Sequence, residues 1–263
     1  MNIRPLAAND FETLLACFNE SFSDYLVPFA LDAARLTEII ARRGVQLDQS
    51  IAAFDGDRMI GFTLNGIDGN RAYDSGTGVV PSHRRAGVGR ELMHASFELL
   101  KTDTYVLEVL EPNVKAIALY KALGFEETRR FQCWTFEAKE RAHVRELANV
   151  DLDEVRRWAD VDPSWQNDVA SIRRAREPHV ALGDEHGAAI VFPKTGDLPL
   201  LAVEQGGRRE GRGRKLLNAA ATRAAKPLRI LNIDDRDAGI AAFLDNVGAT
   251  RTVRQIEMIR SLR

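Results

Sequence analysis

The loop Arg84–Gly89 (RRAGVG) has the residue types and spacing of a phosphate-binding turn. It follows a strand-like run that ends at Val79-Val80 and leads into a helical pattern. The first turn of a helix leaves backbone N–H groups without intrahelical partners, and glycines keep them accessible. A pyrophosphate can bind there, at the positive end of the helix dipole. Taken alone, the loop is equally consistent with a glycine-rich turn that carries solvated arginines.

A second group of polar residues follows within the next 31 positions of the chain. Glu108 lies in a strand-like run, Asn113 precedes a helical pattern, and Tyr120 lies within that pattern. A carboxylate on a strand inside a sheet is costly unless it is hydrated, paired or functional. The alternatives are a salt-bridged edge residue for Glu108 and a core aromatic for Tyr120. Asp74, Glu20 and Asp24 compete with Glu108 as bases, and His83 is expected in a solvent-exposed turn.

The elements that position these residues alternate between helical and extended patterns. Asp55-Gly56-Asp57 is a hairpin signal between two extended runs, and Gly76 and Gly78 interrupt the strand before the loop. The periodicity predicts helices at 9–19, 31–43, 89–101 and 114–123, and strands at 51–54, 59–66, 72–80, 104–110 and 131–137.

The second half of the chain repeats the first with a constant offset. Arg208 follows Arg84 by 124 residues, and the same offset relates Gly248 to Gly124. It also aligns Leu92-Met93 with Leu216-Leu217 and the strand core Leu107, Val109 with Leu231, Ile233. One offset that aligns a loop, a helix, a strand and a terminal glycine indicates a diverged tandem duplication. We place the two domains at 1–137 and 143–263.

Composition excludes several classes of function. The net charge of −2 provides no global field for nucleic acid or membranes, and no apolar run approaches the ~20 residues of a membrane span. Two cysteines, Cys17 and Cys133, offer no metal cluster, and they favour a reducing, cytoplasmic setting. We therefore expect a soluble cytoplasmic protein without a metal, a nucleic-acid partner or a membrane partner.

The motifs together resemble the GCN5-related N-acetyltransferase (GNAT) family. The first motif of the resemblance is the pattern Arg84, Gly87, Gly89 after Gly78-Val79-Val80. The second is the series Leu107-Glu108-Val109, Asn113, Ala116–Tyr120 (AIALY) and Leu123-Gly124-Phe125. The series is similar to bacterial ribosomal-protein alanine acetyltransferases. It covers about residues 1–137, while Phe18–Pro28 matches the acceptor-side loop only in position and character. The implied fold is α/β (α+β), with two tandem GNAT folds that each contain a mixed, mostly antiparallel sheet flanked by helices.

The resemblance implies an acetyltransferase that moves an acetyl group from acetyl-CoA, its co-substrate, to a primary amine of a small molecule or peptide. It implies Tyr120 as general acid and Glu108 as general base, without a covalent acyl-enzyme. Cys17 and Cys133 lie outside both motifs, which argues against a thiol intermediate. Glu20 and Asp24 beside Tyr25 fit a cationic amine, or simply the end of a surface helix. The implied cofactor contacts are Val79, Val80, Arg84, Arg85, Ala86, Gly87, Val88, Gly89, Arg90 and Asn113.

The second copy lacks these chemical groups. At the same offset, Glu108 becomes Asn232, Asn113 becomes Asp237 and Tyr120 becomes Leu244. We expect a degenerate repeat that packs on the first, shapes the acceptor site or forms a homodimer. Its basic cluster either binds an anion or a second CoA, or is a solvated face; the cluster comprises Arg208, Arg209, Arg212, Arg214 and Lys215. The alternative for the whole chain is a non-catalytic acyl-CoA-binding regulatory module.

Overall fold

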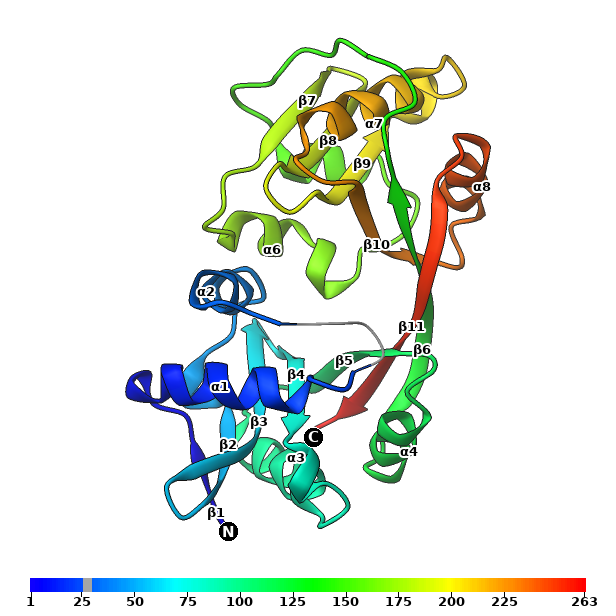
Figure 1. Ribbon diagram of the computed structural model, residues 1–263. Helices are drawn as coiled ribbons and strands as arrows, with labels where there is room; N and C mark the ends of the chain where they lie inside the picture. The colour runs from blue at the N-terminus through cyan, green and yellow to red at the C-terminus, as the bar shows by residue number, and fades with distance from the viewer. Residues whose placement is uncertain (26–29) are drawn as a thin grey trace. The chain divides into compact units, whose positions relative to one another are not determined.

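The structure is a computed structural model that describes residues 1–25 and 30–263. The chain forms two compact units (Figure 1). The first unit contains Met1–Thr128 together with Glu257–Arg263, and the second contains Arg129–Ile256. The predicted acceptor-side segment Phe18–Pro28 lies only partly within this description, because residues 26–28 are outside the described residues.

The sheet of the first unit is mixed and mostly antiparallel. Its strands follow the order β1-β2-β3-β4-β5-β11, and only the C-terminal end of β11 belongs to this unit. The pairs from β1 to β4 are antiparallel, whereas β4 and β5 are parallel. The strands are β1 (Asn2–Pro5), β2 (Ile51–Asp55), β3 (Arg58–Asp68), β4 (Arg71–Val79), β5 (Thr104–Leu110) and β11 (Thr250–Ser261). The helices are α1 (Phe11–Ser21), α2 (Ala33–Arg42), α3 (Val88–Leu99) and α4 (Val114–Ala122).

Helices cover both faces of this sheet. Because side chains alternate along a strand, the neighbouring residues Gly61 and Phe62 of β3 point to opposite faces of the sheet. The ring of Phe62 stacks on Phe18 of α1, with the ring centroids 5.3 Å apart. Gly61 faces α3, where a Cβ atom would lie 3.1 Å from Leu92. The apolar faces of α1 and α3 thus enclose the strands, and this packing holds β4 in place.

The second unit has the same kind of sheet. Its strand order is β11-β6-β10-β9-β8-β7, in which β11 contributes residues 250–256. β9 and β10 are parallel, and the pairs β6–β10, β7–β8 and β8–β9 are antiparallel. The strands are β6 (Glu126–Phe136), β7 (Val180–Asp184), β8 (Gly187–Phe192), β9 (Asp197–Val203) and β10 (Leu228–Asp234). The helices are α5 (Leu152–Arg157), α6 (Val169–Arg174), α7 (Arg212–Arg223) and α8 (Ala238–Asn246).

The offset of 124 residues found in the sequence relates the elements of the two units. α7 begins 124 residues after α3, and β10 and α8 follow β5 and α4 by the same interval. The loops also share an unusual backbone: Arg85 and Arg209 have φ of 65° and 66°, while Gly87 and Gly211 have φ of 85° and 78°. Two copies that share positive φ at matched positions have the same loop conformation.

The predicted fold class is confirmed, since each unit is a mixed, mostly antiparallel sheet flanked by helices. The units differ in one respect from the sequence repeats at 1–137 and 143–263. Residues 129–136 of β6 belong to the second unit, and residues 257–261 of β11 belong to the first. The repeat boundaries therefore remain a prediction about the duplication.

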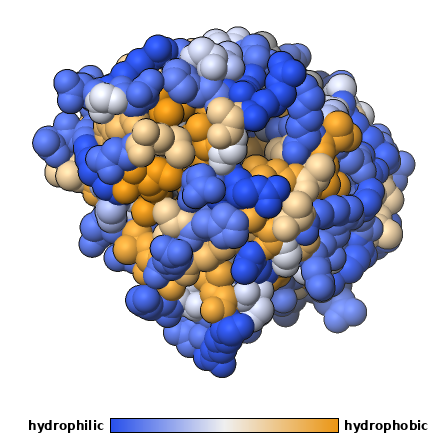
Figure 2. All heavy atoms as spheres, turned by 90° about the horizontal axis from the view of Figure 1, so that it is seen from below, coloured by the Kyte–Doolittle hydropathy of each residue, from blue (hydrophilic) through white to orange (hydrophobic). Residues whose placement is uncertain are grey.

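Few of the large apolar side chains that the structure describes are fully exposed. Figure 2 shows one face of the molecule, on which apolar residues lie among charged ones. Of the described large hydrophobic residues, Met1 and Val114 are exposed. No helix in the described part of the chain has both the length and the apolar character that a membrane span requires.

Candidate active site

The site is built on an opening between β4 and β5. Their parallel register runs from Arg71–Thr104 to Asp74–Leu107. β4 then continues to Val79 against β3, after a register shift between Leu64 and Asn65, while β5 continues to Leu110. A register shift of this kind bends a strand away from its neighbour. The irregularity that Gly76 and Gly78 predict therefore lies beside the point where the pairing ends.

Tyr120 approaches the opening from the side of α4. Its hydroxyl lies 3.5 Å from Oδ2 of Asp74, at the outer limit of a hydrogen bond. The side chain is buried. Burial, together with the charge of Asp74, raises the pKa of the Tyr120 phenol well above its usual value. A phenol in this setting keeps its proton at neutral pH and can deliver it to a stronger base.

Glu108 lies on the opposite face of the same opening. Tyr73 donates a hydrogen bond of 3.0 Å from its hydroxyl to Oε2 of Glu108. Tyr73 is the neighbour of Asp74 along β4, so the two side chains point to opposite faces of the sheet. The carboxylate and the Tyr120 phenol are therefore separated by the plane of the sheet.

The loop after β4 presents a row of backbone amides. Gly87 is the residue before α3 and has φ of 85°, a left-handed conformation that glycine adopts without steric cost. Among the described residues, the amides of 85–89 donate to no backbone carbonyl, whereas those of Arg90 and Glu91 bond to the Gly87 carbonyl. The N-terminus of α3 thus has the geometry of an anion site, as the sequence predicts.

Arg84 makes a different kind of contact from the one expected of a phosphate ligand. Its guanidinium pairs with both oxygens of Asp24, at 2.7 and 2.8 Å, and donates to the carbonyls of Ser21 and Val79. This pairing lowers the pKa of Asp24. The side chain of Arg84 therefore ties the end of α1 to the end of β4, and a phosphate would have to compete with Asp24 for it.

The competing carboxylates are in other settings. Glu20 pairs with Arg58 at 2.6 Å and Asp24 pairs with Arg84, so the two acids that suggested a cationic amine already have cationic partners. His83 is half-buried rather than fully exposed, with Nε2 3.6 Å from Asp55. Of the three alternative bases, Asp74 is the one at the opening.

Asn113 is the N-cap of α4, directly before the helix as predicted. Its Oδ1 accepts the N–H of Ala116 at 3.3 Å. The side chain of Asn113 also hydrogen-bonds to the hydroxyl of Tyr25, a residue whose pKa burial raises. The side chain of Asn113 therefore caps α4 with its oxygen and also hydrogen-bonds to Tyr25, whose ring lies beside the opening.

Comparison with known proteins assigns the domain that carries these groups. Residues 11–125 match the model of the Acetyltransferase (GNAT) family. This stretch of the chain is a GNAT domain. The chain is also 38% identical over 74 residues to a [Ribosomal protein bS18]-alanine N-acetyltransferase of Salmonella typhimurium. That match covers 27% of this chain and half of the length of the relative.

Solved structures extend the similarity of fold beyond the GNAT domain. A proposed acetyltransferase from Pyrococcus horikoshii has a TM-score of 0.77 at 18% identity, covering 99% of this chain and 89% of its own. A GCN5-related N-acetyltransferase from Sphaerobacter thermophilus has a TM-score of 0.73 at 15% identity, with 100% and 96% covered. A tandem GNAT protein from the clavulanic acid biosynthesis pathway has a TM-score of 0.69 at 17% identity, with 100% and 98% covered. At these identities the likeness concerns the fold, and the third supports the tandem arrangement.

The glycines of β4 in the GNAT domain differ in how much space surrounds them. A Cβ atom on Gly78 would lie 2.8 Å from the Phe62 ring and 2.9 Å from Ser21, whereas one on Gly76 would lie 3.9 Å from Phe18. We expect Gly78→Ala to lower the free energy of unfolding by about 1–3 kcal/mol, because overpacking a core costs this much. Gly76→Ala is the matched control and should cost less. Chemical denaturation of both variants checks this, and equal losses would contradict it.

The buried carboxylate of Asp74 should make the stability of the GNAT domain depend on pH. Burial raises the pKa of Asp74 from an ordinary 3.8 to about 6. The folded state thus binds the proton more tightly than the unfolded state, so stability falls as the pH rises from about 4 to about 6. We expect Asp74→Asn to raise the free energy of unfolding by up to about 3 kcal/mol at pH 8 and by less than about 1 kcal/mol at pH 4. Denaturation at both pH values measures this, and a gain independent of pH would contradict it.

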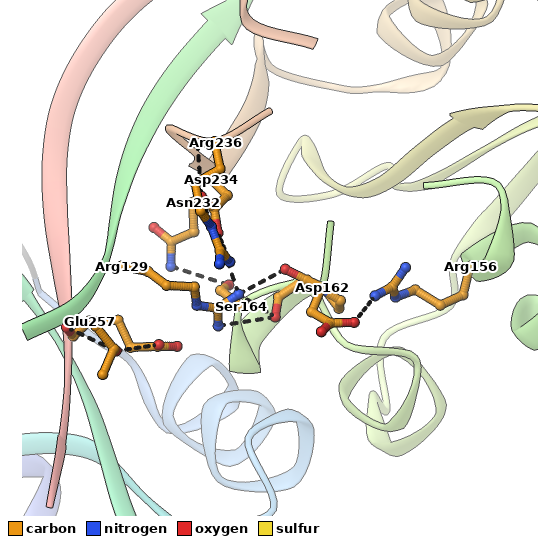
Figure 3. A network of polar contacts seen from close by, with 10 residues as sticks. Arg129, Arg156, Asp162, Ser164, Asn232, Asp234, Arg236 and Glu257 are labelled. Atoms are coloured by element: carbon orange, nitrogen blue, oxygen red, sulfur yellow. Dashed lines mark hydrogen bonds and ion pairs between the residues drawn. The ribbon is translucent and has the colours of Figure 1, made fainter. Parts of the chain in front are cut away.

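The second unit has packing residues at the positions of Glu108 and Tyr120. Asn232, the counterpart of Glu108, donates to Ser164 Oγ at 3.3 Å (Figure 3). It also accepts a hydrogen bond from Gln255 at 2.8 Å. Arg129 donates to the carbonyl of Asp162 at 2.8 Å beside it. Leu244, the counterpart of Tyr120, is fully buried. Residues 162–164 and their polar contacts therefore lie beside Asn232, the strand position that Glu108 occupies in the GNAT domain.

The loop of the second unit repeats the tie made by Arg84. Arg208 pairs with Asp160 at 2.7 Å and donates to the carbonyls of Trp158 and Val203. Arg212 pairs with Asp184. Two members of the predicted basic cluster thus have acidic partners. A cavity of about 380 Å³ adjoins this loop, and its lining includes Arg209 and Arg214.

Several residues of the site were missed at the sequence level. Tyr73 and Thr77 belong to no motif, and their partners lie 35 and 3 residues away. Arg84 and Asp24 were both singled out, but the sequence did not indicate that they pair across 60 residues. Asp74 was recognised only as a competing base. The signal that could have singled it out is the repeat, since the residue 124 positions later is Leu198.

Proposed function

We propose that the chain transfers an acetyl group from acetyl-CoA to a primary amine, and that its GNAT domain performs the reaction. The observation that carries the proposal is the placement of Tyr120 and Glu108 on opposite faces of one opening between β4 and β5. Acetyl transfer needs a base on the side of the attacking amine and an acid on the side of the leaving sulfur. Two titratable groups that approach one gap from opposite sides satisfy this requirement.

In the proposed reaction the two groups exchange protons with different partners. Glu108 accepts a proton from the protonated amine, and the neutral nitrogen then attacks the thioester carbonyl carbon. The carbon–sulfur bond of the resulting tetrahedral adduct breaks, and Tyr120 donates its proton to the departing thiolate. The tyrosinate then accepts, through solvent, the proton that the acylated nitrogen must lose, which restores the phenol and leaves a neutral amide. The raised pKa of Tyr120 keeps the phenol protonated until that step. No covalent acyl-enzyme is required, and the buried thiol of Cys17, whose pKa is about 11, is a poor nucleophile.

The loop 84–89 fits the pyrophosphate of acetyl-CoA. Gly87 has a left-handed backbone conformation, and the amides at the start of α3 donate to no backbone carbonyl. These amides can bind the pyrophosphate, and the proposed site includes no metal. Val79 and Val80 lead into this loop, and Arg85, Ala86, Val88, Gly89, Arg90 and Asn113 complete the proposed contacts. Arg84 supports the loop through Asp24.

The second unit is proposed to be non-catalytic, because Asn232 and Leu244 cannot act as base and acid. Its proposed roles are to shape the acceptor site, to pack on the first domain or to form a homodimer. The cavity beside Arg209 and Arg214 supports an anion-binding role for the second loop. The ion pairs of Arg208 and Arg212 weaken that role.

Release of CoA from acetyl-CoA tests the proposed function. The full chain is mixed with acetyl-CoA and a panel of primary amines that includes a peptide beginning with alanine, chosen because of the Salmonella relative. The same peptide with an acetylated N-terminus is the control. Amine-dependent CoA release supports an acetyltransferase. If acetyl-CoA raises the melting temperature but no amine releases CoA, the chain is an acyl-CoA-binding module instead.

A further inference from the structure

Asp74 is a buried carboxylate that has no assigned role in the proposed reaction. It is 6% exposed and lies at the last recorded pair between β4 and β5. Oδ1 accepts the N–H of Gly76 at 2.9 Å, and Oδ2 accepts the hydroxyl of Thr77 at 2.8 Å. These bonds hold Gly76 and Thr77 close to the Asp74 carboxylate at the point where the opening begins. A buried carboxylate is costly, so its presence at this point calls for a physical reason.

The same oxygen faces the proposed proton donor. Oδ2 lies 3.5 Å from the hydroxyl of Tyr120, a contact that joins residues 46 positions apart. Thr77 and Tyr120 thus approach one oxygen from β4 and α4. A hydrogen bond to a fixed acceptor holds the phenol oxygen in one place, from which its proton can turn to the sulfur when the thiolate forms.

The duplication shows that the fold does not need this carboxylate. The second repeat has Leu198 at the position of Asp74 and Leu244 at the position of Tyr120. Both leucines are buried, and both line one cavity of about 90 Å³. The other two partners, Gly76 and Thr77, correspond to Leu200 and Leu201. The four residues of the contact are therefore replaced together by leucine, while the strand and the helix that carry them are kept.

We propose that Asp74 is a positioning residue for Tyr120, which holds the phenol hydroxyl at the opening where the thioester sulfur leaves. The inference rests on the proposed acetyl transfer. The carboxylate acts through Tyr120 and does not itself touch the reacting atoms. The negative charge of Asp74 also disfavours deprotonation of Tyr120, so the phenol keeps its proton until the thiolate leaves.

A double-mutant cycle tests the dependence on Tyr120. Asp74→Asn, Tyr120→Phe and the double variant are compared by kcat and KM, with acetyl-CoA and the amine of the panel that releases CoA fastest. Asp74→Asn should lower kcat about tenfold or more, because loss of orientation costs this much, with little change in either KM. In the Tyr120→Phe background it should have no further effect. Equal losses in both backgrounds, or a wild-type kcat, would overturn the proposal.

A control variant and a titration separate this inference from the proposed function. Thr63→Val removes the hydroxyl that contacts Thr77 at 3.0 Å and should leave kcat unchanged. The pKa of Asp74, followed by carbon-13 NMR of its carboxyl in the full chain, should rise in Tyr120→Phe, because the phenol stabilises the carboxylate. Besides Tyr120, the ionisable groups that interact with Asp74 are Arg43, Tyr73 and Tyr105. An unchanged pKa would refute the positioning role even if amines are acetylated, whereas a raised pKa with no acetylated amine would refute only the proposed function.

Discussion

Replacing Tyr120 with phenylalanine is expected to lower kcat by about 10²–10⁴-fold, because general acid catalysis contributes this much to proton-transfer steps. The variant keeps the ring, which is buried against Phe125 with the centroids 5.7 Å apart, and loses only the hydroxyl. The thiolate then has to leave without a proton donor. The dissociation constant of acetyl-CoA should stay within about twofold, because the loop 84–89 is unchanged. Steady-state kinetics and calorimetric titration measure the two quantities.

The matched control is Tyr105→Phe. Tyr105 is buried on the same face of the sheet as Asp74, and its hydroxyl donates to Asn65 rather than facing the opening. We expect this variant to lose about 1–3 kcal/mol of stability, since it leaves a buried acceptor unpaired, and to retain its kcat. If Tyr120→Phe retained full turnover, the assignment of the acid would be wrong.

Glu108→Gln is expected to have the second large effect, a fall in kcat/KM of about 10²-fold or more at pH 7. The amide can still accept the hydrogen bond of Tyr73, so the strand should keep its structure, but it cannot take a proton from the amine. The residual activity depends on the fraction of acceptor that is already neutral. It should therefore rise tenfold per pH unit up to the pKa of the amine. The pH profiles of the wild-type protein and the variant show whether this slope appears.

One outcome would assign the base to another residue. A profile of Glu108→Gln that matches the wild type would exclude Glu108 and favour Asp74, the remaining carboxylate at the opening. Tyr73→Phe is the graded control, because it removes the hydroxyl that contacts Glu108 while it keeps the base. Its kcat/KM should fall by less than that of Glu108→Gln.

The two repeats provide an internal comparison for these assignments. Between them the left-handed loop residues and the N-terminal caps of α4 and α8 are conserved in role, as Asn113 and Asp237 both accept an amide of the first helical turn. Glu108, Asp74 and Tyr120 are replaced by Asn232, Leu198 and Leu244. Residues that form backbone turns are retained, whereas the residues proposed to move or position protons are lost. This contrast supports a division between the two halves in which only the first performs chemistry.

The sequence by itself determined the local features of the protein. The helical and extended periods located most elements of the first half to within a few residues, but they missed β1 and placed the start of β6 five residues too late. The glycines at 87 and 89 indicated a loop with accessible amides at the start of a helix. The constant offset identified the duplication. These properties depend on residues close together in the chain, since side-chain period, capping and turn conformation are set within a few positions.

Only the tertiary structure decided how the chemical groups meet. It placed Glu108 on Tyr73, Arg84 on Asp24 and Tyr120 on Asp74, contacts that span 35, 60 and 46 residues. It also assigned the last residues, Glu257–Arg263, to the first unit. Such contacts depend on strand register and helix packing, because a shift of one residue in a strand moves every side chain to the opposite face. The residue types that can do chemistry were therefore visible in the sequence, whereas their partners became visible only in the folded chain.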